Sequence, residues 1–220
     1  MDQLYNILAL DTACGEISAA VIKDGSVYLS EPVENSNGKT RSTTIVPVLE
    51  QLLKKAGLEW HQLHALALGA GPGSFTGLRI AAATLAGINS GLKLPIYHLS
   101  SLAITARQAD VDGPVWVLED ARAGEAFTGC YQRQQQLHAD SCMTWADVET
   151  LPPAYFCCHG EPPVALEHWT RLPLSLDRSA ALAMETELVS AGLNADEVDL
   201  PIYPTPVYLQ LSQAERNAHA

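Results

Sequence analysis

One glycine-rich stretch, which lies between two short apolar segments, constrains the fold of this chain most. Residues 69–87 read GAGPGSFTGLRIAAATLAG, and the apolar segment 64–70 leads into them. Another apolar segment, LPIYHLS, follows at residues 94–100. Short apolar runs predict buried strands, whereas residues 76–89 are long enough for a helix. Because strands joined by a helix form a parallel crossover, we predict an α/β fold.

The residues before this stretch predict the remainder of one lobe. Strands are expected over residues 4–11, 17–23 and 26–31. Asp24-Gly25 predicts a hairpin between the last two, so an N-terminal three-strand meander is expected. Apolar side chains then recur at helical spacing, which predicts a helix over residues 44–56. Pro47 fits best in the first turn of a helix, so this helix is expected to begin near Ser42 to Thr44.

The strand pattern restarts after Gly113, which predicts a second lobe of related build. Two strands are expected over residues 115–120 and 125–132. A helix is expected to start near Ser175 or Asp177 and to end before Gly192. The proline-rich segment 151–173 is expected to be irregular, and the end of the chain is expected to be an extended docking segment. The sequence therefore divides into an N-terminal lobe, residues 1–107, and a C-terminal lobe, residues 108–220.

Charge and hydropathy argue against two classes of function. The 220 residues carry 25 acidic and 13 basic side chains, a formal net charge of −12. Tight binding of nucleic acid by this chain alone is not expected, since such affinity comes mostly from cationic contacts with phosphates. No apolar run approaches about 18 residues, so no membrane span is expected. The start lacks a basic leader, and five cysteines in a long chain predict reduced thiols in a cytoplasmic protein.

The end of the first strand and the glycine loop supply the candidate ligand residues. Gly71 and Gly73 permit close backbone approach, and Ser74 or Thr76 can cap a helix whose N-terminus attracts anions. Asp11 and Thr12 have the chemistry to hold a hydrated Mg²⁺ and a phosphate. The candidates for a nucleotide or phosphate site are Asp11, Thr12, Gly71, Gly73 and Ser74, and they make a small kinase the alternative function. Against this, the loop contains no lysine, and Asp and Thr are equally suited to a turn.

Other clusters of polar residues predict no metal site. Cys157, Cys158 and His159 are adjacent, but the sequence offers no helper pair of ligands elsewhere. The run from Asp120 to Glu125 carries three charges and suits either catalysis or a charged hairpin loop.

Small residues make the helix over 76–89 unusual. They stand four positions apart in three pairs, Gly77/Ala81, Ala82/Ala86 and Ala83/Gly87. Glycine costs a helix about 1 kcal/mol relative to alanine, so two glycines require a compensating contact. A helix packed closely against it, in the same chain or in a second chain, would supply that contact.

Taken together, the motifs resemble the TsaB (YeaZ) family. They are ILALDTA, IVPVLEQLL, GAGPGSFTGLRIAAATLAG, LPIYHLSSLA, VLEDARAGEAF and PVYL. The resemblance implies a two-lobed actin-like fold of the acetate kinase–Hsp70–actin class, with mixed sheets flanked by helices and a reduced second lobe. It also implies a cytoplasmic, non-catalytic subunit required to form N6-threonylcarbamoyladenosine in tRNA next to the anticodon. The alternative then becomes a small actin-like sugar or acid kinase.

The same resemblance implies partners rather than a cofactor. The expected partners are the transferase TsaD, in a heterodimer, and the ATPase TsaE; the isolated chain is expected to form a homodimer. tRNA is expected only through the complex, and ATP or ADP only at the junction with partner subunits. TsaD-like chains carry a His-x-x-x-His metal pair where this sequence has Ser101 and Thr105. Two departures from TsaB itself are Arg41, where many relatives have a His, and Gln210, where an Arg is common.

The resemblance also implies that the helices over 44–56 and 76–89 form the association face. The residues expected at that face are Ile45, Val48, Leu49, Leu52, Gly77, Leu78, Ala81, Ala82, Leu85 and Ala86.

Overall fold

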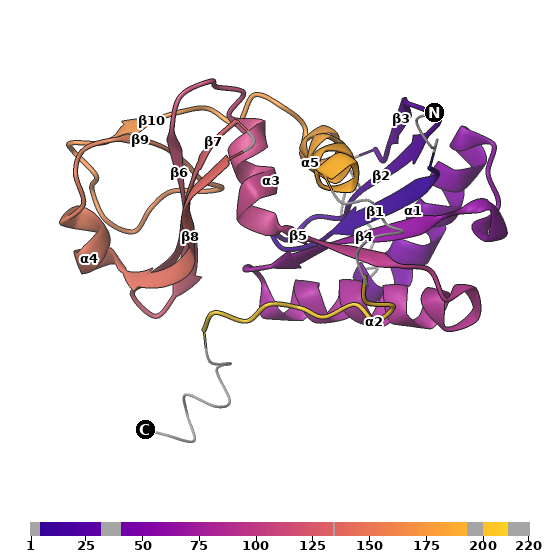
Figure 1. The fold of residues 1–220 in the computed structure, drawn as a ribbon. Helices are drawn as coiled ribbons and strands as arrows, with labels where there is room; N and C mark the ends of the chain where they lie inside the picture. The colour runs from indigo at the N-terminus through magenta and orange to yellow at the C-terminus, as the bar shows by residue number, and fades with distance from the viewer. Residues whose placement is uncertain (1–4, 32–40, 134, 193–199, 211–220) are drawn as a thin grey trace, which may run out of the picture.

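Two five-stranded sheets lie side by side in this protein (Figure 1). The structure is a computed structural model that describes residues 5–31, 41–133, 135–192 and 200–210. Helix α3 (Ser101–Gln108) lies between the sheets and contributes side chains to the apolar clusters of both. The expected arrangement of mixed sheets flanked by helices is confirmed.

The first sheet is mixed and has the order β3-β2-β1-β4-β5. Its strands are β1 (Ile7–Asp11), β2 (Ser18–Lys23), β3 (Ser26–Leu29), β4 (Ala65–Gly71) and β5 (Ile96–Ser100). The first three form an antiparallel meander, and β1, β4 and β5 are parallel. Every residue of β1 and β4 is buried, as expected for strands that are covered on both faces. The predicted meander and parallel crossover are therefore confirmed.

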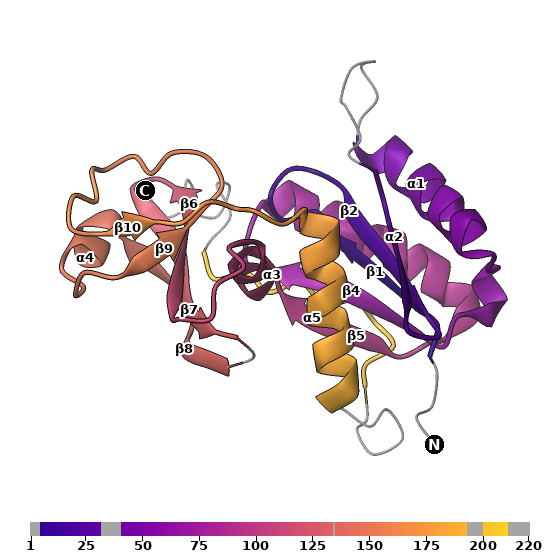
Figure 2. The ribbon, with the colours of Figure 1, turned by 90° about the horizontal axis from the view of Figure 1, so that it is seen from above.

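Alternating side chains of β1 supply the two cores of this sheet. Leu8 and Leu10 point to the face covered by α1 (Arg41–Ala56) and α2 (Phe75–Leu92). Ile7 and Ala9 point to the opposite face, covered by α5 (Arg178–Gly192) and part of α3. Figure 1 shows α2 below the sheet and α5 above it, and Figure 2 shows α1 and α5 on opposite sides.

The second sheet has the order β10-β9-β6-β7-β8. Its strands are β6 (Val115–Arg122), β7 (Glu125–Gln132), β8 (Gln135–Thr144), β9 (Tyr155–Cys157) and β10 (Thr170–Arg171). The short helix α4 (Trp145–Glu149) follows β8, and a 3-10 turn, η1 (Trp60–Gln62), precedes β4 in the first sheet.

The proline-rich segment 151–173 is more ordered than its composition predicts. It contains β9 and β10, which pair in parallel, and β9 also pairs with β6. Phe156 and Trp169 from this segment pack edge to face and join a buried cluster with Trp145 of α4. The sequence of these strands lacks the alternating apolar pattern that would have predicted them. Contacts between distant aromatic side chains hold the segment instead.

Helix α5 packs against the first sheet, although its position in the sequence predicts that it belongs to the C-terminal lobe. Asp177 begins the helix, since its carboxylate accepts the Ser179 N–H at 2.8 Å and its carbonyl accepts the Ala181 N–H at 3.0 Å. Ala181, Leu182 and Ala183 are buried against β1 and β2. The predicted lobe 108–220 thus contributes its main helix to the core of the first lobe.

Residues 200–210 dock along the first sheet as an extended segment. The Ile96 N–H donates to the Pro201 carbonyl at 2.8 Å, and the Val207 N–H donates to the Ala70 carbonyl at 2.7 Å. The side-chain amide of Asn89, on α2, donates to the Ile202 carbonyl at 2.8 Å. The predicted docking segment is confirmed, and its partner is this chain's own β4, β5 and α2 (Figure 1).

Helix α1 begins earlier than Pro47 predicts. It starts at Arg41, so Pro47 lies inside the helix rather than in its first turn. Proline lacks the N–H that bonds back to the preceding turn. Pro47 is exposed, so water can reach the backbone there and lessen the cost.

Two further features concern the environment of the chain. Within the described ranges, no helix is both long and apolar enough to cross a membrane. All five cysteines lie in described segments, and none of them forms a disulfide.

Candidate functional site

A cleft of about 810 Å³ opens between the two sheets. Its walls are the turn after β1, the glycine loop before α2, the end of β6, the loop after β9 and residues 207–210. The parallel strands β1, β4 and β5 all end at this edge of the first sheet. Open α/β sheets bind ligands outside the carboxyl ends of their strands, so this cleft is the candidate site.

The glycine loop packs against the turn after β1 rather than around a phosphate. A Cβ at Gly77 would overlap the Thr12 carbonyl oxygen, and one at Gly73 would lie 2.6 Å from the Ala13 Cβ. The Thr12 hydroxyl donates to the Gly77 carbonyl at 2.7 Å, and the Ser74 N–H donates to the Ala13 carbonyl at 2.8 Å. The contact that compensates for glycine at position 77 is therefore this turn of the same chain.

Asp11 belongs to a buried ion pair. Its Oδ2 accepts a hydrogen bond from the Arg178 guanidinium at 2.9 Å, and its Oδ1 accepts the Ala13 N–H at 2.6 Å. The exposed fractions of the two side chains are 0% for Asp11 and 7% for Arg178. The same guanidinium donates to the Thr105 hydroxyl at 2.8 Å and to the Ser101 carbonyl at 3.1 Å. Arg178 thus joins α5, α3 and β1 at one point beside the cleft.

This geometry corrects the predicted nucleotide site. Asp11, Thr12 and Gly71 are buried, and Gly71 donates its N–H to the Ser101 hydroxyl at 3.1 Å. Of the five predicted residues, only Gly73 and Ser74 line the cleft. The Ser74 hydroxyl already accepts the Gly77 N–H at 3.3 Å, as predicted for the cap of α2.

Most of the predicted association residues also lie elsewhere than expected. Nine of the ten are buried in this chain: Ile45, Val48, Leu49, Leu52, Gly77, Leu78, Ala81, Ala82 and Leu85. Ala86 alone is exposed. The apolar residues that repeat along a helix form the face that packs against its own sheet. The residues predicted for the association surface are mostly those of this buried face. The exposed face of α2 instead carries Ala83, Ala86 and Gly87.

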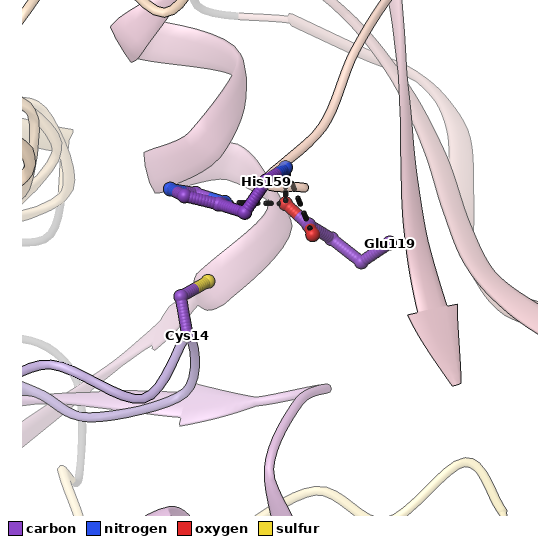
Figure 3. A group of neighbouring side chains, drawn as sticks. All are labelled: Cys14, Glu119 and His159. Carbon is purple, nitrogen blue, oxygen red and sulfur yellow. Dashed lines mark hydrogen bonds and ion pairs between the residues drawn. The ribbon is translucent and has the colours of Figure 1, made fainter. Parts of the chain in front are cut away.

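Sequence reasoning missed a cluster of three side chains in the cleft, Cys14, Glu119 and His159 (Figure 3). His159 Nδ1 lies 2.7 Å from Glu119 Oε1, and the backbone N–H of His159 also donates to that carboxylate. Burial alone would lower the pKa of His159, but interactions with Cys14 and Glu119 raise it to about 10. The residues come from three distant segments, so the sequence carries no local signal for the cluster.

The charged run from Asp120 to Glu125 forms the hairpin between β6 and β7 at the rim of the cleft. Arg122, Ala123 and Gly124 have positive φ, as tight turns require, and Arg122 Nε lies 3.7 Å from the Asp120 carboxylate. The Gln210 amide donates to the Glu125 carboxylate and so ties the end of the described chain to this hairpin. Gln210 therefore still supplies a donor where the resemblance places an arginine.

Comparison with known proteins identifies the family. The model of the family described as TsaD, tRNA N6-adenosine threonylcarbamoyltransferase, matches residues 35–154, which is more than half of the chain. The chain belongs to the TsaD family. Within it, the chain is similar to proteins named TsaB or YeaZ, and the resemblance inferred from the motifs is confirmed.

Among these relatives are two proteins named "tRNA threonylcarbamoyladenosine biosynthesis protein TsaB". The Escherichia coli protein is 36% identical over 132 residues, which cover 59% of this chain and 56% of that protein. The Bacillus subtilis protein is 30% identical over 132 residues, which cover 60% of this chain and 57% of that protein. The chain therefore matches little more than half the length of these relatives.

The solved structure of YeaZ from Pseudomonas aeruginosa resembles almost the whole chain. Its TM-score is 0.72 at 25% identity, and the match covers 94% of this chain and 100% of that one. With the two mixed sheets described above, this likeness confirms the actin-like two-lobed fold class.

Proposed function

We propose that this chain is a non-catalytic subunit of the machinery that forms N6-threonylcarbamoyladenosine in tRNA. In this proposal it binds a TsaD-type transferase, supports its activity together with a TsaE-type ATPase, and works in the cytoplasm. The observation that carries the proposal is the likeness to YeaZ over 94% of the chain, together with membership of the TsaD family. The net charge of −12 fits a subunit that meets tRNA only through its partners.

The chemistry around Arg178 supports the non-catalytic assignment. Ser101 and Thr105 occupy the positions at which the family resemblance places the histidine pair of TsaD-like chains. The Arg178 guanidinium donates to the Ser101 carbonyl and to the Thr105 hydroxyl. These two oxygen atoms are therefore already engaged in hydrogen bonds, and neither residue offers an imidazole ligand.

The same ion pair weighs against the alternative, a small actin-like sugar or acid kinase. That activity would need Asp11 to hold a hydrated Mg²⁺ at the end of β1. Both carboxylate oxygens of Asp11 are instead occupied, one by Arg178 and one by the Ala13 N–H. A nucleotide, if one binds, is placed by this proposal at a junction between the cleft and a partner subunit.

The proposed association surface is the exposed side of α1 and α2, both towards a TsaD-type partner and between two copies of this chain. Val46 on α1 is 38% exposed, and Ala83, Ala86 and Gly87 are exposed on α2. A Cβ added at Gly87 would meet nothing within 4 Å, so the backbone of α2 is open to close approach there. Small side chains at these positions let another helix approach closely.

An Ala86→Trp variant is expected to lose association while its thermal midpoint stays unchanged. The indole would project from an exposed position, so it would block a closely packed partner without disturbing the core of this chain. Size-exclusion chromatography with light scattering, alone and with a purified TsaD-type partner, measures the effect. The matched control is Ala139→Trp on β8, which is also exposed but lies in the second sheet. Normal association of Ala86→Trp would show that this surface is not the interface.

Reconstitution tests the proposed function itself. A TsaD-type transferase, a TsaE-type ATPase and the enzyme that makes threonylcarbamoyl adenylate are mixed with unmodified tRNA, with or without this chain. We expect the modified nucleoside to form only when this chain is present. Equal yields without it would refute the proposal. ATP-dependent phosphorylation of a small acceptor by this chain alone would establish the kinase alternative.

A further inference from the structure

We propose that Cys14, Glu119 and His159 form a binding site for a divalent transition-metal ion of the zinc class, placed between the two lobes. One sulfur, one oxygen and one nitrogen ligand atom from these residues all lie within 4.8 Å of one another. Thiolate, carboxylate and imidazole are the three side-chain ligands that Zn²⁺ takes in proteins. This inference departs from the prediction of no metal site and does not depend on the proposed function.

The three ligands converge from parts of the chain that only the fold brings together. Cys14 lies in the turn after β1, Glu119 on β6 and His159 in the loop after β9. Figure 3 shows the Cys14 thiol pointing towards the His159 ring and the Glu119 carboxylate. Cys14 therefore comes from the first sheet and the other two from the second, so a bound ion would join the two lobes.

The geometry requires little movement to hold an ion. Ligand atoms around tetrahedral Zn²⁺ are roughly 3.5 Å apart, given bond lengths of about 2.0–2.3 Å. The three ligand atoms are now at most 4.8 Å apart, and small side-chain rotations would bring them to that separation. The hydrogen bond of 2.7 Å between His159 and Glu119 would be replaced by one bond from each residue to the ion.

Charge and exposure also suit such an ion. A Cys14 thiolate and the Glu119 carboxylate together neutralise a divalent cation, and the nearby guanidinium of Arg178 is already paired with Asp11. The exposed fractions of the side chains are 31% for His159 and 13% for Glu119, so an ion can enter from solvent. Because the three residues also line the 810 Å³ cleft, a fourth coordination position would face that cleft and accept water or an anionic ligand.

Cobalt and zinc titrations of the metal-stripped full chain test the site. We expect one ion per chain, and with Co²⁺ an absorption band that arises from charge transfer between the thiolate and the metal. Cys14→Ser should abolish the band and weaken Zn²⁺ binding by roughly tenfold or more, since even outer partners of metal ligands are worth that much. Zn²⁺ should raise the thermal midpoint of the parent chain and raise it less in Cys14→Ser. Cys142→Ser, at another partly exposed cysteine, should behave as the parent does.

Two results would overturn the proposal. One is the absence of stoichiometric Zn²⁺ binding by the parent chain, which would leave His159 and Glu119 as an ion pair beside a thiol. The other is equal binding, with the same Co²⁺ spectrum, by the parent and Cys14→Ser. His159→Ala and Glu119→Gln are expected to weaken binding as well, with circular dichroism as a check on folding. If either of these two variants fails to fold, Cys14→Ser decides, because Cys14 is partly exposed and serine is nearly isosteric.

Discussion

Replacing Arg178 with methionine is expected to lower the free energy of unfolding by about 3–5 kcal/mol, because it leaves a buried carboxylate without its cation. Asp11 is fully buried, and the guanidinium of Arg178 lies 2.9 Å from its Oδ2. The substitution also removes donors from the Ser101 carbonyl and the Thr105 hydroxyl. Since a domain is typically stable by only about 5–15 kcal/mol, this loss is a large part of the total. Equilibrium unfolding in urea measures it.

An exposed ion pair provides the matched control for this prediction. Arg133 lies 3.1 Å from Asp112, with exposed side-chain fractions of 67% and 84%. Arg133→Met is expected to cost less than about 1 kcal/mol, since solvent screens such pairs. The double variant Asp11→Asn/Arg178→Met should be more stable than Arg178→Met alone, because no buried charge is then left unpaired. If Arg178→Met lowered the free energy of unfolding as little as Arg133→Met does, the buried pair would not be a main source of stability.

Gly77→Ala and Gly87→Ala are expected to change stability in opposite directions, although both glycines lie on α2. A Cβ at Gly77 would overlap the carbonyl oxygen of Thr12, a backbone atom that is held by the turn after β1. Such overpacking costs about 1–3 kcal/mol or more. A Cβ at Gly87 would meet nothing within 4 Å, so alanine there should stabilise the helix by about 0.5–1 kcal/mol.

Urea unfolding of the two variants, side by side with the parent chain, measures this difference. The comparison is internal, because the residue change and the helix are the same and only the space around the new methyl group differs. A stabilised Gly77→Ala variant would mean that the turn after β1 moves freely away from α2. The account of the glycine loop as a packing device would then be wrong.

The sequence predicts the first sheet well because its elements are specified locally. Two strong signals are the Asp24-Gly25 hairpin and the glycine loop that separates β4 from α2. Both positions need glycine for reasons that act within a few ångströms, namely a positive φ at Gly25 and the approach of Thr12 to Gly77. Local requirements of this kind can be recognised in a single sequence.

Features that depend on distant contacts were not predicted. The strands β9 and β10 are short, and among their side chains only Phe156 and Cys157 are buried. Phe156 packs in a cluster with Trp145 and Trp169, so its burial depends on distant residues rather than on an alternating pattern in the strand. Helix α5 has a clear start at Asp177, but nothing in its sequence says which sheet it covers. Small and apolar residues on α2 likewise do not reveal which of its faces is external.

The candidate site was the part least accessible from sequence. Asp11 has the chemistry of a metal ligand, and only Arg178, from a distant part of the chain, makes it a partner in an ion pair. Cys14, Glu119 and His159 meet for the same reason, since each lies on a different segment. Ser74, which caps α2, was one of the two cap residues that the sequence predicted, because a helix cap is a local interaction.

The proposed function is best tested by mass spectrometry of tRNA nucleosides from cells depleted of this protein. We expect N6-threonylcarbamoyladenosine to fall on depletion and to return when the parent chain is supplied again. We expect a smaller recovery with Ala86→Trp than with the Ala139→Trp control, because only the first lies on the proposed association surface. An unchanged level of the nucleoside in fully depleted cells would contradict the proposed function.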